Sequence, residues 1–218
     1  MKMTTPIRID FISDVSCPWC AIGLQSLEVA LARLNGQVAA EIHFQPFELN
    51  PNMAAEGQDL AEHLTKKYGM SPAQLEQSAE AIRAKGAALG FTFNMDTRRR
   101  IYNTFDAHRL LYWADLEGKQ PALKHALLRA YFTDGKNLSA HETLIELAAE
   151  AGLDATRARE ILASDEFLLQ VRERENYYIQ QGIQAVPSVI INQRHLIQGG
   201  QTSEIFERAL REIAAAQP

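Results

Sequence analysis

The chain contains two cysteines, and both lie in the four-residue string Cys17-Pro18-Trp19-Cys20. This string follows a short apolar run, Ile7–Ile12, and it opens a helical pattern that begins at Ala21. Thiols at the first and fourth positions of a helical turn share one face, with Cβ atoms about 5–6 Å apart. Small adjustments in the first turn bring them to the roughly 3.5–4.5 Å that a disulfide needs. The spacing therefore predicts a pair that closes and opens a disulfide without unfolding the protein.

The two cysteines are predicted to differ in reactivity because they differ in position. Unpaired N–H groups and the positive end of the helix dipole stabilise a thiolate at Cys17. Cys20 lies one turn further into the helix, so we expect it to be more buried and less acidic. Cys17 is the predicted attacking thiolate, and Cys20 is positioned to resolve the mixed disulfide.

The two residues between the cysteines are expected to tune the motif. Pro18 fixes its φ angle and removes a donor where no intrahelical acceptor is lost. Trp19 is neutral, so it gives a thiolate no cationic stabilisation, and its indole offers an apolar surface beside the sulfurs.

A zinc site is the main alternative for a Cys-x-x-Cys pair, and it needs two further ligands. No third cysteine exists, and the six histidines are scattered without a pair at ligand spacing near the motif. The position of the pair at a strand–helix junction also argues against two inert core cysteines. We expect no metal and no bound cofactor, the redox group being the Cys17–Cys20 disulfide itself.

The composition narrows the class of protein. The 218 residues carry 27 acidic and 22 basic side chains, for a formal charge of -5. Nucleic-acid binding is not favoured, and the densest basic cluster, Arg98-Arg99-Arg100, is interpreted as a solvated helix start. The N-terminal residues lack a signal-like apolar stretch, and no 18-residue apolar run occurs. We therefore expect a soluble cytoplasmic protein without membrane association, either a monomer or a homodimer. That compartment keeps thiols reduced, which favours a cycling pair over a structural disulfide.

The pattern of elements indicates an α/β protein with an insertion. Strands predicted at 7–12 and 39–45 flank a helix over 17–34, a βαβ opening with parallel pairing. A hairpin of strands follows at 188–192 and 195–198, and a last helix covers 202–215. We expect these outer pieces, residues 1–50 and 165–218, to form one discontinuous domain around an inserted helical subdomain of residues 51–164.

The insertion is predicted to be almost entirely helical. Ser71, Pro72 and Gln74 form a capping box with proline at the first helical position, and Gly90 ends that helix. Ser139 and Glu142 suggest a second capping box, and Gly152 a stop for the same helix. The remaining helices are expected over 97–117, 120–132, 140–151, 154–163 and 165–181.

Several segments together resemble one known family over essentially the whole chain. They are Phe11-Ile12-Ser13-Asp14-Val15 before the cysteine motif, Pro46-Phe47-Glu48-Leu49-Asn50-Pro51, Asn103-Thr104-Phe105-Asp106-Ala107-His108-Arg109, Val186-Pro187-Ser188 and Gly199-Gly200-Gln201. The chain resembles the DsbA-like branch of the thioredoxin superfamily, and more closely its FrnE-type disulfide oxidoreductases. The resemblance implies a thioredoxin-like fold, βαβ followed by αββα, with a large all-helical insertion.

The resemblance also implies a substrate-binding region. A proline that enters a strand marks an edge or a special turn. In thioredoxin-like folds the residue matching Pro187 has a cis peptide and faces the cysteines, and the backbone of Val186 pairs with an extended substrate. Asn103 and His108 then belong to a helix that roofs the cleft over Cys17. Alternatively, His108 is a core histidine bonded to backbone.

Three functions remain open from the sequence. The first is a protein disulfide oxidoreductase or isomerase acting on protein or small-molecule disulfides. Trp19 stands where the family's periplasmic oxidant has histidine, which favours a reductase, an isomerase or a pathway-specific thiol enzyme. The second resembles 2-hydroxychromene-2-carboxylate isomerase and kappa-class glutathione transferase, with glutathione as co-substrate, although those enzymes usually carry serine at the place of Cys17. The third is a holdase that binds unfolded chains in an apolar groove of the insertion.

Overall fold

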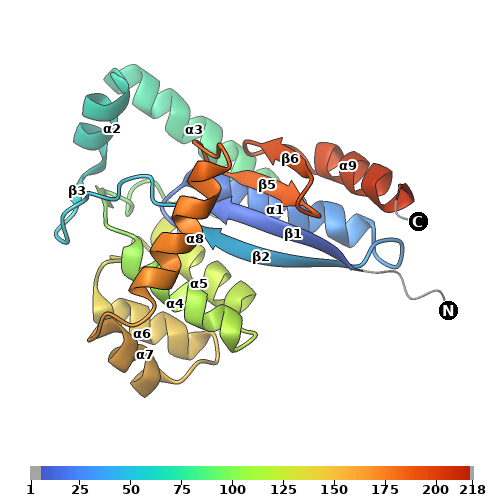
Figure 1. The fold of residues 1–218 in the computed structure, drawn as a ribbon. Helices are drawn as coiled ribbons and strands as arrows, with labels where there is room; N and C mark the ends of the chain where they lie inside the picture. The colour runs from blue at the N-terminus through green and yellow to red at the C-terminus, as the bar shows by residue number, and fades with distance from the viewer. Residues whose placement is uncertain (1–5, 217–218) are drawn as a thin grey trace.

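The computed structural model describes residues 6–216, and its centre is a four-stranded sheet (Figure 1). The strand order is β2-β1-β5-β6, from β2 (Ala40–Pro46), β1 (Ile7–Ser13), β5 (Ser188–Ile191) and β6 (His195–Gln198). β1 pairs with β2 in parallel and with β5 antiparallel, and β5 pairs antiparallel with β6. The parallel opening and the late hairpin predicted from the sequence are confirmed.

Helices cover both faces of this sheet. α1 (Pro18–Arg33) packs beside α9 (Ser203–Ala215), and α8 (Leu168–Gln180) crosses the opposite face (Figure 1). All residues of β1 are buried except Arg8, as expected for a central strand with helices on both sides. This burial fixes the carboxyl end of β1, where the cysteine motif begins.

The insertion lies between β2 and α8. Its elements are β3 (Gln58–Asp59), α2 (Leu60–Tyr68), α3 (Pro72–Ala88), β4 (Arg100–Ile101), α4 (Phe105–Leu116), α5 (Gln120–Phe132), α6 (His141–Glu150) and α7 (Ala155–Leu162). One cluster of buried apolar side chains runs from Phe11 and Leu24 around the sheet to Leu110 and Leu127 in the insertion. The motif therefore starts in a core that both parts of the chain share.

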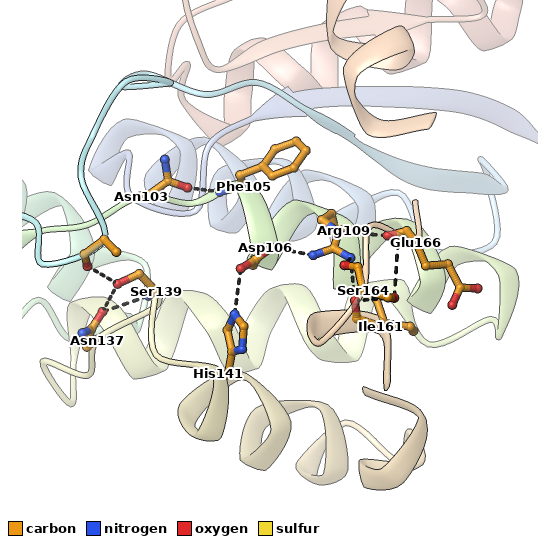
Figure 2. A network of polar contacts seen from close by, with 11 residues as sticks. Asn103, Phe105, Asp106, Arg109, Asn137, Ser139, His141, Ile161, Ser164 and Glu166 are labelled. Carbon is orange, nitrogen blue, oxygen red and sulfur yellow. Dashed lines mark hydrogen bonds and ion pairs between the residues drawn. The ribbon is translucent and has the colours of Figure 1, made fainter. Parts of the chain in front are cut away.

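Three of the four predicted helix signals in the insertion are confirmed, among them Gly90, which follows the end of α3 with φ 76°. The hydroxyl of Ser71 accepts the N–H of Gln74 at 3.3 Å, and the Gln74 side chain accepts the N–H of Ser71 at 2.8 Å. Gly152 follows the end of α6 with φ 81°. The second capping box is wrong, because the Ser139 hydroxyl donates to the carbonyl of Ala55 at 2.7 Å instead (Figure 2).

The helix predicted over 97–117 begins only at Phe105. Residues 100–101 pair with residues 58–59 as a short antiparallel ladder, which takes the backbone out of the helix. Asn103 then accepts the N–H of Phe105 at 2.9 Å and starts α4 (Figure 2). Ile101, which falls within the predicted helix 97–117, consequently lies in a strand instead.

The interpretation of Arg98-Arg99-Arg100 as a solvated helix start holds only for the exposure of Arg99 and Arg100, because no helix begins there and Arg98 is buried. Arg98 is buried, with its guanidinium carbon 5.0 Å and 4.9 Å from the ring centroids of Tyr131 and Phe132. Its Nη2 donates to the carbonyl of Ser16 at 3.3 Å. Stacking on aromatic faces compensates the burial of this cation, and the same contact fastens the insertion to the residue before Cys17.

A buried arginine holds the insertion together. Arg109 donates to the Asp106 carboxylate at 2.8 Å and to the carbonyls of Glu166, Ile161 and Ser164 (Figure 2). Asp106 in turn lies 3.0 Å from the ring of His141. These contacts join α4 to α6, α7 and the segment before α8.

Arg109→Leu is expected to lower the free energy of unfolding by about 3 kcal/mol, because three carbonyls lose a charged donor in a buried place. Urea unfolding measures the loss. The control is Arg129→Leu, which removes a half-exposed guanidinium paired with Glu150 and should cost about 1 kcal/mol or less. Equal losses in the two variants would contradict a buried role for Arg109.

Candidate active site

The cysteine motif occupies the junction between β1 and α1. Cys17 is the N-cap residue, with extended backbone (φ −89°, ψ 114°), and Pro18 is the first helical residue. The N–H of Cys17 donates to the carbonyl of Asp14 at 3.2 Å, and the N–H of Cys20 donates to the carbonyl of Cys17 at 3.1 Å. The Cys17 sulfur therefore lies among the free N–H groups at the start of the helix.

The two thiols are free and differ in environment. Cys17 is 4% exposed, and Cys20 is 0% exposed. A hydrogen bond from the Cys20 thiol lowers the pKa of Cys17 despite its burial, and the N–H groups of Cys20 and Trp19 act in the same direction. Burial raises the pKa of Cys20 well above its usual value, and the neighbouring Cys17 raises it further. The pair therefore consists of one sulfur prepared to ionise and one that holds its proton.

The loop between α8 and β5 forms a wall opposite the first cysteine. The peptide bond between Val186 and Pro187 is cis, the geometry implied by the family resemblance. The Cys17 sulfur lies 3.8 Å from the carbonyl of Val186. Glycines allow α1 and the loops that face it to come this close. A Cβ atom on Gly23 would lie 3.2 Å from Pro187, and a Cβ atom on Gly200 would lie 3.0 Å from the Trp19 carbonyl.

Trp19 is half-buried at the edge of the motif. Lys85 of α3 places its ammonium 6.0 Å from the centroid of the Trp19 ring. Tyr68 lies at the end of α2, and its side chain is only partly covered. This partial burial raises the pKa of Tyr68, and the charge of Cys17 raises it further. Side chains of the insertion thus reach the surroundings of the motif on this side.

A buried carboxylate, Asp14, supports the backbone before Cys17. Its Oδ1 accepts the N–H of Ser16 at 3.1 Å, and its Oδ2 accepts the N–H of Leu49 at 2.7 Å. Burial alone would raise the pKa of Asp14. The pKa is nevertheless lowered, mainly by His108 and to a smaller extent by these two N–H groups. From the sequence, Asp14 belongs to a segment that carries the family resemblance, and no motif points to its role.

A buried lysine is the second residue that the sequence analysis missed. Lys124 of α5 donates to the Ser13 hydroxyl at 2.9 Å and lies 5.5 Å from the centroid of the Phe44 ring. Burial lowers its pKa to about 8, against the opposing charges of Cys20, Asp14 and Cys17. The sequence signal is faint, a single lysine among the apolar residues of one helix.

The predicted site residues of the insertion, Asn103 and His108, do not lie together. The Asn103 amide donates to the carbonyl of Met53 at 3.1 Å and accepts from Phe105, so it anchors a loop (Figure 2). His108 is buried, and its Nε2 lies 3.7 Å from Oδ1 of Asp14. The histidine therefore faces the carboxylate below the motif, which neither interpretation from the sequence anticipated.

Comparison with known proteins agrees with this geometry. The DSBA-like thioredoxin domain family matches residues 8–211. The chain belongs to this family. The DsbA-like resemblance and the thioredoxin-like α/β fold predicted from the sequence are thereby confirmed, and membership supports an oxidoreductase or isomerase role.

Three individual proteins illustrate the range of the likeness. A probable DsbA oxidoreductase, SCO1869 from Streptomyces coelicolor, superposes with a TM-score of 0.91 at 35% identity, over 97% of this chain and 92% of that one. The uncharacterized protein YwbO of Bacillus subtilis is 25% identical over 94% of this chain and 96% of its own. The cytosolic disulfide reductase DsbM of Pseudomonas aeruginosa shares the fold, with a TM-score of 0.61, at 18% identity over 96% and 98% of the two chains.

The acidity of Cys17 should depend on the group at position 20. Cys20→Ala removes the donor that lowers the Cys17 pKa, whereas Cys20→Ser keeps a hydroxyl donor there. We expect the Cys17 pKa to be higher in the alanine variant than in the serine variant. Thiolate absorbance at 240 nm as a function of pH measures both. Identical titrations would show that the hydrogen bond has no influence.

Proposed function

We propose that this protein is a thiol–disulfide oxidoreductase that cycles Cys17 and Cys20 between dithiol and disulfide. The observation that carries the proposal is the placement of Cys17 at the start of α1, 3.8 Å from the Val186 carbonyl, with Cys20 buried one turn behind it. A half-buried Val186 whose carbonyl faces the nucleophile suits an extended substrate that carries a disulfide. Protein disulfides and small-molecule disulfides both meet this requirement.

The reaction consists of two exchanges. The Cys17 thiolate attacks one sulfur of the substrate, forming a mixed disulfide and releasing the other substrate sulfur as a thiolate that takes up a proton. Cys20 then attacks the Cys17 sulfur, and the second substrate sulfur leaves as a thiol. The dithiol has lost two electrons and two protons, and the substrate disulfide has gained them.

Cys20 must lose its proton in the second exchange, although burial holds its pKa high. We assign Lys124 to this step because its neutral form accepts a proton and its charged form stabilises a buried thiolate. Burial brings the pKa of Lys124 to about 8, so both forms are accessible near neutral pH. The Ser13 hydroxyl orients the amine.

Glutathione is the proposed thiol that reduces the Cys17–Cys20 disulfide and restores the dithiol. The structure of DsbM, which shares this fold, was solved with GSH. A glutathione-dependent isomerase or transferase of the same fold would not need a resolving thiol. Activity that persists unchanged in Cys20→Ser with glutathione present would favour that second class.

The proposal is tested by insulin reduction with dithiothreitol as electron donor. Cys17→Ser should abolish the activity, because no nucleophile remains at the helix start. Cys20→Ser should accumulate mixed disulfides with the substrate, seen as a mass increase that reductant reverses, because nothing resolves them. Full activity of Cys17→Ser would exclude the proposed chemistry.

The pH dependence of stability tests the state of Lys124. Because its pKa is lowered from 10.5 to about 8, the unfolded chain binds this proton more tightly. Wild type should therefore gain about 3 kcal/mol relative to Lys124→Met as the pH rises from 8 to 10.5. Urea unfolding of both proteins across this range measures the difference. A constant difference would mean that folding does not lower the pKa of Lys124.

A further inference from the structure

A buried carboxylate lies close to the nucleophile, and the proposed chemistry does not use it. The side chains of Asp14 and His108 are 1% and 2% exposed, and their Oδ1 and Nε2 atoms are 3.7 Å apart. Within residues 6–216 the Nε2 of His108 has no hydrogen-bond partner. The contact with Asp14 is thus the polar interaction on which this nitrogen depends.

Asp14 connects three segments to the residue that attacks. Its carboxylate holds the N–H of Ser16 before the motif and the N–H of Leu49 after β2. Its main-chain carbonyl accepts the N–H of Cys17. His108 adds α4 to this set. The carboxylate is therefore fixed relative to the Cys17 sulfur and cannot turn away toward solvent.

A fixed negative charge near a sulfur opposes its ionisation. The charge of Asp14 raises the pKa of Cys17, while His108 keeps Asp14 ionised despite burial. Other ionisable groups also act here. Electrostatic interactions couple Cys17 to Cys20, Lys124 and Tyr68. Asp14 interacts in the same way with Lys67, Lys124 and Tyr131. Glu48 interacts with His108.

We infer that Asp14 and His108 form a buried pair that moderates the nucleophilicity of the Cys17 sulfur, with His108 acting only through Asp14. The inference rests on the proposed function, since it assigns these positioning residues to the same thiol chemistry. An ionised Asp14 disfavours the thiolate, and a less stable thiolate makes the disulfide harder to reduce. The pair thereby keeps the motif from becoming a strong oxidant, in the same direction as the neutral Trp19.

The test compares Asp14→Asn, His108→Leu and the double variant. Removing the charge, or removing the imidazole that keeps it ionised, should lower the Cys17 pKa by about one unit. Alkylation of Cys17 by limiting iodoacetamide at pH 5, followed by peptide mass spectrometry, should then be about threefold faster in each variant, because the larger thiolate fraction outweighs the lower nucleophilicity of a less basic thiolate. The double variant should match Asp14→Asn, because His108 has no other route to the sulfur.

The matched control is His125→Leu, which removes a half-exposed histidine 2.8 Å from Glu28 on α1. It should leave the alkylation rate unchanged. A structural role alone would lower the free energy of unfolding while leaving alkylation unchanged or slowing it, as the helix start loosens. That outcome, or an effect of His108→Leu on top of Asp14→Asn, would overturn the inference.

A second measurement uses the equilibrium with glutathione. Both single variants should be more oxidising, with an equilibrium constant for disulfide formation about tenfold smaller than that of wild type. An unchanged equilibrium constant in both variants would contradict the proposed effect of the Asp14–His108 pair on Cys17. Alkylation measures the reactivity of the Cys17 sulfur and does not require turnover. If the wild type failed to reduce insulin, the oxidoreductase function would be refuted, but the alkylation comparison would still test the Asp14–His108 pair.

Discussion

The close approach of α1 to the loop before β5 is the constraint on which the site depends. Gly23 and Gly200 lie where a Cβ atom would press against Pro187 or the Trp19 carbonyl. Without that approach, the Cys17 sulfur would not face the Val186 carbonyl, and the helix start would open to water. The pairing of β1 with β5 sets the distance, because the motif follows β1 and the loop precedes β5.

The insertion contributes chemistry to this site. His108 comes from α4 and Lys124 from α5, and both are buried below the motif. His108 affects the pKa of Asp14, and the charge of Asp14 in turn affects the pKa of Cys17. Lys124 affects the pKa of Cys20. The negative charge of Asp14 and the positive charge of protonated Lys124 thus act on two sulfurs whose pKa values are shifted in opposite directions. In the proposed function, the helical insertion is therefore part of the electrostatic environment that separates the attacking from the resolving cysteine.

Local sequence patterns predicted the strands around the motif and the helix that it opens, and the family resemblance implied the proline loop opposite. These features depend on neighbouring residues or on motifs with known geometry. The failures at Ile101, Ser139 and Arg98 share another cause, since each residue contacts a distant segment. The pairing of β4 with β3, the bond from Ser139 to Ala55 and the stacking of Arg98 on Tyr131 leave no local signal.

The same reasoning explains the candidate site. The roles of Cys17 and Cys20 follow from helix position, and they stay predictions until activity is measured. Asp14 and Lys124 escaped the sequence analysis because burial, which no motif records, makes them important. The boundaries of the inserted subdomain, at residues 51 and 164, also stay predictions.

The contact of Arg98 with Ser16 has a consequence for motion in the folded state. This arginine ties the residue before Cys17 to the aromatic rings of α5. Any partial opening that separates α5 from the sheet therefore also releases the start of α1. Proteins open locally below the global transition. An opening of the insertion that breaks the contact between Arg98 and Ser16 is therefore expected to make the buried Cys20 more reactive as well.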